Sequence, residues 1–316
     1  MAKVMTICRA VGRAISQGPA FGPFAPCTQK MHLLSSSHSF LGSLLVCGSR
    51  KLQSPPERRI SDTRFNAPLS AEEVARPVGV CTMLRLPYQE SAEGLKAAFI
   101  GVPLDTGTSN RPGARFGPRH IRAESCMVRT YNATTRAAPY NSLMVADIGD
   151  VHVNLYNLKD SCRRIRGAYQ KIMAAGCIPL TLGGDHTITY PILQAVAERH
   201  GPVGLIHVDA HTDTAEQALG EKIYHGTPFR RCVDEGLLDC KRVVQIGIRG
   251  SSYSPEPYKF CREQALEIIR GSRGLNLVGC DLVEVAPMYD LSGNTALTAA
   301  NLLFEMLCVL PGVQSY

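Results

Sequence analysis

The chain has 316 residues, of which 45% are hydrophobic and 19% are charged. This length suits one large α/β domain with an extension, and no stretch approaches the roughly 18 apolar residues of a membrane-spanning helix, so we expect no membrane partner. The net charge of +7 arises mainly in residues 1–56, where six of the 34 basic residues lie without any Asp or Glu. The remaining 28 basic residues face 27 acidic ones, which makes no electrostatic case for a nucleic-acid partner.

The first segment, residues 1–56, has the composition of a mitochondrial transit peptide, with Arg, Ser and Ala but no acidic residue. Two alternatives remain open. The segment is a disordered tail without a targeting role, or its apolar run at residues 40–47 is a signal-peptide core, although that run is short and far from the start. We predict mitochondrial localisation, a linker arm over residues 57–74, and one domain over residues 75–316.

Strands and helices alternate along the domain. This order predicts a mostly parallel sheet with helices on both faces. The expected strands are residues 97–104, 142–150, 177–184, 203–211, 242–250 and 275–285, and the expected helices are residues 158–175, a helix from Thr187, a short one near Asp234 and residues 264–271.

Metal-ligand side chains follow two of these strands. Residues two apart on an extended backbone share a face, so Asp209 and His211 project the same way, and Asp213 follows if the extension persists. His186 comes directly after the preceding strand. A single Asp or His in such a place is usually a turn former or helix cap. Four donors at the carboxyl ends of one parallel sheet instead indicate a site for Mn²⁺ or Zn²⁺.

Five motifs resemble the ureohydrolase family, the binuclear manganese enzymes that include arginase and agmatinase. They are GGDH at 183–186, DAHTD at 209–213, HGTPF at 225–229, EVAP at 284–287 and GVPLDTGTSNRPGARFGPRHIR at 101–122, the last resembling the agmatinase branch. The resemblance covers roughly residues 75–311. It implies a three-layer αβα sandwich, Mn²⁺ as cofactor, and hydrolysis of a small linear guanidino compound, agmatine or a guanidino acid, to urea and an amine.

The same resemblance assigns roles to residues that carry little signal alone. His225 would be the proton shuttle in the pocket wall, a role that suits a side chain titrating near neutrality. Glu284 would bind the guanidinium, which a carboxylate can hold in bidentate fashion. Residues 107–122 are expected to form a structured loop at the mouth of the site, without chemistry of their own. The chain is a possible homo-oligomer.

One family motif is missing. The family carries a strand ending in S-F-D-x-D before EVxP, whereas this chain has no aspartate between Asp239 and Asp281 and looks internally truncated near residues 251–263. The family holds two ions with four aspartates and two histidines. With only Asp209 and Asp213 as carboxylates, we expect one ion or none, because two close cations would repel each other.

The missing motif has two further consequences. We expect the sheet to lack one interior strand and the activity to be impaired. A non-catalytic variant that keeps the fold and oligomerises with an intact sister chain is the alternative. A mononuclear zinc deacetylase of related fold is a weaker third reading, since that chemistry also needs an aspartate from the missing strand.

Overall fold

The structure is a computed structural model that describes residues 3–9, 65–248, 276–290 and 292–314; for residues 3–9 only the backbone is considered. Three expectations fall outside this range. They are residues 10–56 of the leader, the truncation near residues 251–263, and the helix expected at residues 264–271. In the part of the chain described, no helix is long and apolar enough to cross a membrane.

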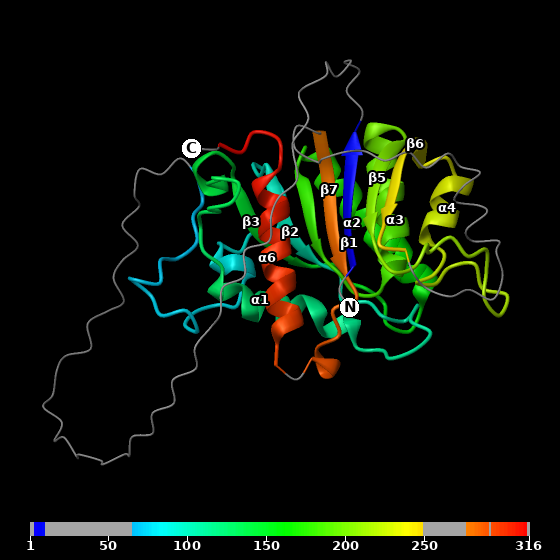
Figure 1. Ribbon diagram of the computed structural model, residues 1–316, viewed down its shortest axis with the longest axis horizontal. Helices are drawn as coiled ribbons and strands as arrows, with labels where there is room; N and C mark the ends of the chain where they lie inside the picture. The colour runs from blue at the N-terminus through cyan, green and yellow to red at the C-terminus, as the bar shows by residue number, and fades with distance from the viewer. Residues whose placement is uncertain (1–2, 10–64, 249–275, 291, 315–316) are drawn as a thin grey trace, which may run out of the picture. The chain divides into compact units, whose positions relative to one another are not determined.

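A single mixed sheet organises the described residues (Figure 1). Its order is β3-β2-β4-β7-β1-β5-β6, and all pairs are parallel except those made by β1. The strands are β1 Lys3–Arg9, β2 Ala97–Gly101, β3 Val145–Asp150, β4 Ile178–Leu182, β5 Val203–Val208, β6 Leu238–Ile246 and β7 Asn276–Val283.

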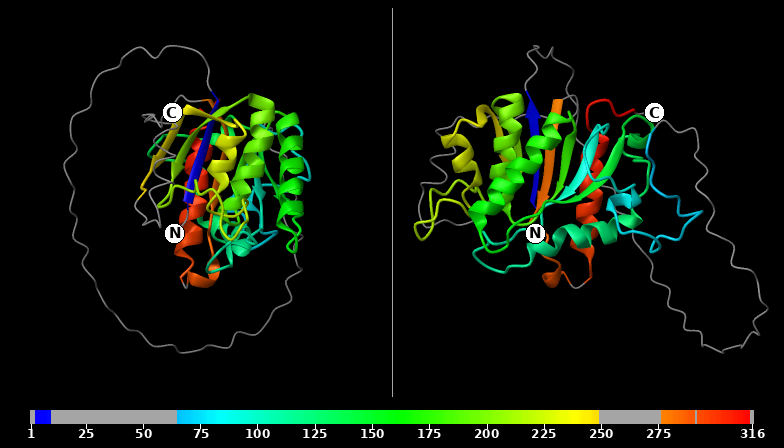
Figure 2. Two further views of the ribbon diagram at one scale, coloured as in Figure 1. Left: turned by 90° about the vertical axis from the view of Figure 1, so that its right-hand side faces the viewer. Right: turned by 180° about the vertical axis from the view of Figure 1, so that it is seen from behind.

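Helices cover both faces of the sheet (Figure 2). The α-helices are α1 Gly117–Glu124, α2 Leu158–Ala174, α3 Thr189–His200, α4 Pro228–Asp234 and α6 Asn294–Cys308. Short 3-10 turns are η1 Met83–Arg85, η2 Ala114–Phe116, η3 Ser125–Met127, η4 Pro139–Asn141, η5 His186–Ile188 and η6 Pro287–Tyr289.

The hydrophobic core lies in two layers, one on each side of the sheet. Alternate residues of β2 show the division, since Ala98 and Ile100 pack in the cluster that contains α2 and α3, while Phe99 packs in the cluster that contains α6. All three side chains are almost fully buried. A strand that is buried on both faces has a continuous run of apolar residues, and β2 has such a run. The predicted three-layer αβα sandwich is therefore confirmed.

The expected interior gap in the sheet is not present. Strand β1, from the segment expected to be a leader, lies between β7 and β5 and pairs with both in antiparallel orientation (Figure 1). The sequence pattern of the domain gave no reason to place a leader segment in the sheet. The backbone of two buried strands needs hydrogen-bond partners, and β1 provides them.

Buried ion pairs fix the loop that connects β2 with α1. Asp105 accepts hydrogen bonds from Gly113 N at 2.7 Å and from Arg115 Nε at 2.5 Å. Arg122, at the end of α1, donates to both Asp147 oxygens at 2.7 and 3.0 Å and to Asp150 at 2.6 Å. These bonds tie the loop to the carboxyl end of β3, which is the edge of the sheet that carries the candidate site.

Candidate metal centre

The turn after β4 directs the first donor into the sheet edge. Gly184 cannot be replaced by a larger residue, because a Cβ there would lie 1.8 Å from Leu104 O. The next residue, Asp185, is buried and accepts from Thr187 N at 2.8 Å and from Gly107 N at 2.9 Å. This cap begins the short turn η5 and presents the fully buried His186 to the end of β5.

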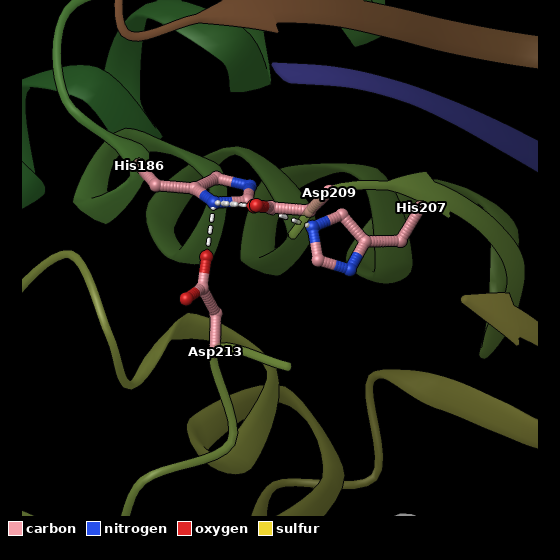
Figure 3. Close-up of side chains that lie close together, drawn as sticks. All are labelled: His186, His207, Asp209 and Asp213. Atoms are coloured by element: carbon pink, nitrogen blue, oxygen red, sulfur yellow. Dashed lines mark hydrogen bonds and ion pairs between the residues drawn. The ribbon is translucent and has the colours of Figure 1, made fainter. Parts of the chain in front are cut away.

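Four buried side chains meet at this point (Figure 3). Each of His186, His207, Asp209 and Asp213 offers a ligand-type atom, and these atoms lie within 4.8 Å of one another. His186 Nδ1 lies 2.5 Å from Asp213 Oδ2 and 3.5 Å from Asp209 Oδ2. His207 Nε2 lies 3.1 Å from Asp209 Oδ2. Asp213 reaches the cluster with a φ of 51°, the left-handed region that Asp tolerates better than most residues.

The hydrogen bonds of His207 indicate that it orients Asp209. Gln245 Nε2 donates one proton to Thr212 O at 2.7 Å and the other to His207 Nδ1 at 2.9 Å. An acceptor at Nδ1 leaves the proton of a neutral imidazole on Nε2, which then donates to Asp209. Burial lowers the pKa of His207, with the hydrogen bond to Asp209 opposing it, so the neutral form is favoured. His207 therefore has no lone pair for a cation.

His211 lies on the solvent side of the same carboxylate. Its side chain is 61% exposed, and its Nδ1 is 3.6 Å from Asp209 Oδ1. Its backbone N–H donates to that oxygen at 3.0 Å. The structure thus gathers His186, Asp209 and Asp213 tightly, places His211 at the open rim of the cluster, and adds His207 beneath it.

The donor set fits one divalent transition metal ion. Imidazole nitrogen combined with carboxylate oxygen suits Mn²⁺ or Zn²⁺, and Asp209 and Asp213 together balance the charge of one such ion. Asp281 lies outside the cluster. Its Oδ2 accepts from Thr189 Oγ1 at 2.8 Å, and its buried Oδ1 has no hydrogen-bond partner among the described residues. Burial raises the pKa of Asp281 to about 6.

A pocket of about 250 Å³ is lined in part by Asp185, the residue that precedes His186 in the chain. His225 and Glu284 both line it, with His225 Nδ1 3.9 Å from Glu284 Oε1. Ser109 Oγ lies 2.8 Å from His225 Nε2 and holds the other side of the ring. Glu284 follows β7 with a φ of 65°, and its N–H donates to Gly184 O at 2.8 Å. The two residues expected to act on a substrate thus share one cavity wall.

The segment after β2 also lines this pocket; of residues 107–122, expected to be one loop, the last six belong to α1. Thr108, Asn110 and Arg111 line the cavity. The guanidinium of Arg111 lies 5.7 Å from the ring centroid of Tyr289, within cation–π distance. In the described part of the chain Arg111 has no ion-pair partner, so a full positive charge faces the pocket.

Comparison with known proteins identifies the family. The model of the arginase family matches residues 95–265 and 254–308. The chain is 66% identical to the mitochondrial agmatinase of Gallus gallus, covering 82% of this chain and 94% of that protein. It is 62% identical to the mitochondrial guanidino acid hydrolase of Homo sapiens, covering 81% and 90%. These names agree with the mitochondrial localisation predicted here.

The alignments also bear on the missing motif. The match to the human protein runs over 316 residues but includes only 81% of this 316-residue chain, so part of the human protein has no counterpart here.

The solved structure of proclavaminate amidino hydrolase from Streptomyces clavuligerus is similar in fold. Its TM-score is 0.69 at 28% identity, covering 74% of this chain and 98% of that chain. A hypothetical agmatinase from Burkholderia thailandensis gives a TM-score of 0.64 at 29% identity, covering 74% and 91%. The family model, the related sequences and the shared fold agree, and the chain belongs to the arginase family.

Proposed function

We propose that this chain hydrolyses a small linear guanidino compound to urea and an amine, with lower activity than its full-length relatives. One observation carries the proposal: His186 of the buried cluster directly follows Asp185, which lines the same pocket as His225 and Glu284. Similar proteins are named agmatinase, guanidino acid hydrolase and, in Pseudomonas aeruginosa, guanidinobutyrase.

His186, Asp209 and Asp213 would hold a single Mn²⁺ ion, with His211 closing the site from its exposed side. When bound, such an ion acts as a Lewis acid and makes water a nucleophile near neutral pH. His207 would keep Asp209 in position through the hydrogen bond at 3.1 Å.

The other two groups would handle the substrate. The Glu284 carboxylate can accept two N–H groups of a guanidinium, which fixes the orientation of the planar group. His225 lies within 3.9 Å of that carboxylate and can pass a proton to the departing amine. Ser109 restrains the ring from the opposite side.

The charge of the pocket wall favours a guanidino acid over agmatine. Arg111 faces the cavity without an ion-pair partner in the described chain, and its charge would attract a carboxylate at the far end of the substrate. Asp290 also lines the pocket, but its Oδ2 already accepts from Thr295 N at 2.7 Å at the start of α6. The cation is therefore the more available partner.

The expected weakness of the activity follows from the count of carboxylates. A second divalent ion would need further negative charge, which β1 cannot supply because its sequence KVMTICR contains no Asp or Glu. The same deficit favours the second candidate, a non-catalytic variant that keeps the fold and assembles with an intact sister chain. Self-assembly into a homo-oligomer remains a prediction.

Urea release separates the two candidates. Purified full-length chain with excess Mn²⁺ is given 4-guanidinobutyrate or agmatine, which differ mainly in the charge at the far end. We expect slow urea release, faster from the acid, and a loss of this preference in Arg111→Met but not in Arg111→Lys. If wild type releases urea from both substrates no faster than the Glu284→Gln variant does, the hydrolase proposal is refuted and the non-catalytic variant remains.

The leader is proposed to direct import. A full-length chain with a C-terminal fluorescent tag should reach mitochondria, and one with its six leader Lys and Arg residues changed to Gln should not. A wild-type chain that stays in the cytosol would refute this proposal.

A further inference from the structure

Strand β1 occupies an interior position that no other described segment fills. Five of its residues pair with β5, from Val4 opposite Val208 to Cys8 opposite Gly204. On the other side it pairs with β7 from Lys3 opposite Val283 to Arg9 opposite Asn276, with one register shift. We propose that the slot between β5 and β7 is a strand-binding site, and that its ligand is the chain's own N-terminal segment, residues 3–9.

With β1 in place, β5 and β7 are too far apart to pair with each other. Neighbouring strands lie about 4.8 Å apart, so β5 and β7 are about twice that distance from each other with β1 between them. Both are buried strands: Leu205 of β5 and Leu277 and Leu282 of β7 are at most 1% exposed. Each unpaired buried backbone group costs about 1–3 kcal/mol, so a few of them would consume the typical total stability of about 5–15 kcal/mol.

The N-terminal segment fits the slot in length and composition. It has seven residues, between the six of β5 and the eight of β7. Val4, Thr6 and Ile7 are β-branched, and the segment contains neither Gly nor Pro, so it can donate hydrogen bonds along its whole length. An interior strand must bond on both sides, which is the condition that excludes proline.

The antiparallel orientation determines which end of β1 lies at the edge of the sheet that carries the site. It places the backbone of Lys3 opposite Val283, at the end of the sheet where Asp209, Asp213 and Glu284 lie. A parallel strand would bring Arg9 and the chain that follows it to this end instead. Either orientation would bring one basic residue to this edge, and neither would bring a carboxylate, because KVMTICR contains no Asp or Glu.

The leader would then have a structural role in addition to targeting. A transit peptide is normally discarded, yet removal of residues 1–56 would empty the slot. The segment would therefore remain with the folded chain, either uncut or bound after cutting. One part of the chain, β1, would then complete the backbone pairing of the sheet, and another part, after β4 and β5, would bind the metal.

The test begins with the full-length chain carrying a protease recognition sequence after Ser36. After folding and cleavage, we expect fragment 1–36 to elute with the rest of the chain in size-exclusion chromatography and to be identified there by mass spectrometry. A fragment that separates from a remainder whose β5 and β7 amides stay protected from hydrogen exchange would overturn the proposal. Separation with loss of that protection would support it.

A proline variant supplies the second measurement. Thr6→Pro removes one N–H in the middle of β1, while Ser16→Pro makes the same change outside the strand. We expect amides of β5 and β7 to exchange about 100-fold faster in Thr6→Pro than in Ser16→Pro. Equal exchange in the two variants would contradict the proposal. If Thr6→Pro fails to fold, the cleaved wild-type chain decides.

Discussion

Strands β5 and β1 are neighbours in the sheet but contribute different things to it. β5 is parallel to β6 and is followed directly by Asp209, which lies beside His186 of the turn after β4. β1 is antiparallel, comes from the far N-terminus and carries no acidic residue. The comparison teaches that backbone pairing can be satisfied by any extended segment, whereas a metal centre depends on particular side chains at strand ends.

The largest expected effect is the loss of Mn²⁺ affinity in Asp209→Asn, which removes a metal ligand after β5. Structural Zn²⁺ sites with four ligands bind with about 10–16 kcal/mol, so one ligand accounts for about 2.5–4 kcal/mol, and we expect a loss of about 70- to 900-fold in Mn²⁺ affinity. Asp234→Asn, on the exposed surface of α4, is the control. Calorimetric titration of both variants gives the answer, and equal affinities would remove Asp209 from the site.

Asp281 is a buried carboxylate outside the metal cluster, and its ionisation should lower the stability of the folded chain. Burial raises its pKa to about 6 from 3.8. Between these values the folded state holds a proton that the unfolded state has released, so stability falls as pH rises and stays lower above about pH 6. In EDTA, Asp281→Asn should gain on wild type by about 3 kcal/mol between about pH 4 and pH 7.

Urea unfolding at the two pH values measures this gain. The exposed Asp234→Asn serves again as the control, and it should follow wild type at both values. Parallel curves for Asp281→Asn and wild type would show that Asp281 ionises at no cost in the folded chain.

A smaller effect is expected beneath the site. His207→Phe removes the donor that holds Asp209 but keeps the ring volume, and loss of such supporting groups costs about 10–100-fold in metal affinity. Gln245→Leu should weaken binding in the same direction, because Gln245 sets the tautomer of His207. A loss in His207→Phe as large as that in Asp209→Asn would mean that His207 is itself a ligand.

The smallest effect concerns the pocket. Ser109→Ala removes the hydrogen bond at 2.8 Å to His225 Nε2, and an exposed bond of this kind contributes about 1 kcal/mol. The affinity for 4-guanidinobutyrate should fall about five-fold, while Mn²⁺ affinity stays unchanged. A change in the metal affinity instead would place Ser109 in the metal centre.

The sequence predicted much of the fold because its signals are local. The helix expected at residues 158–175 is α2, Leu158–Ala174, and the strand expected at 177–184 contains β4. The strand expected to begin at Arg242 begins instead at Leu238, which pairs with Val203. That pairing is a contact between distant residues, and no local pattern reveals it.

The two features that sequence reasoning missed have different causes. His207 stands two residues before Asp209, so the alternation that links Asp209 with His211 also includes it, but the apolar residues around it make it look like part of a buried strand. β1 has a strand-like composition, but an acid-free segment at the start of a chain indicates targeting, and only its pairing with β5 and β7 in the fold reveals its other use.

The metal content of the full-length chain tests the central claim most directly. The purified protein is saturated with Mn²⁺, dialysed against metal-free buffer and analysed by mass spectrometry of its metals, with protein measured by amino-acid analysis. The account predicts one Mn²⁺ for each chain, held where β4 and β5 end. Two ions for each chain would contradict it, since the cluster contains only two carboxylates, and none would show that the three gathered donors do not suffice.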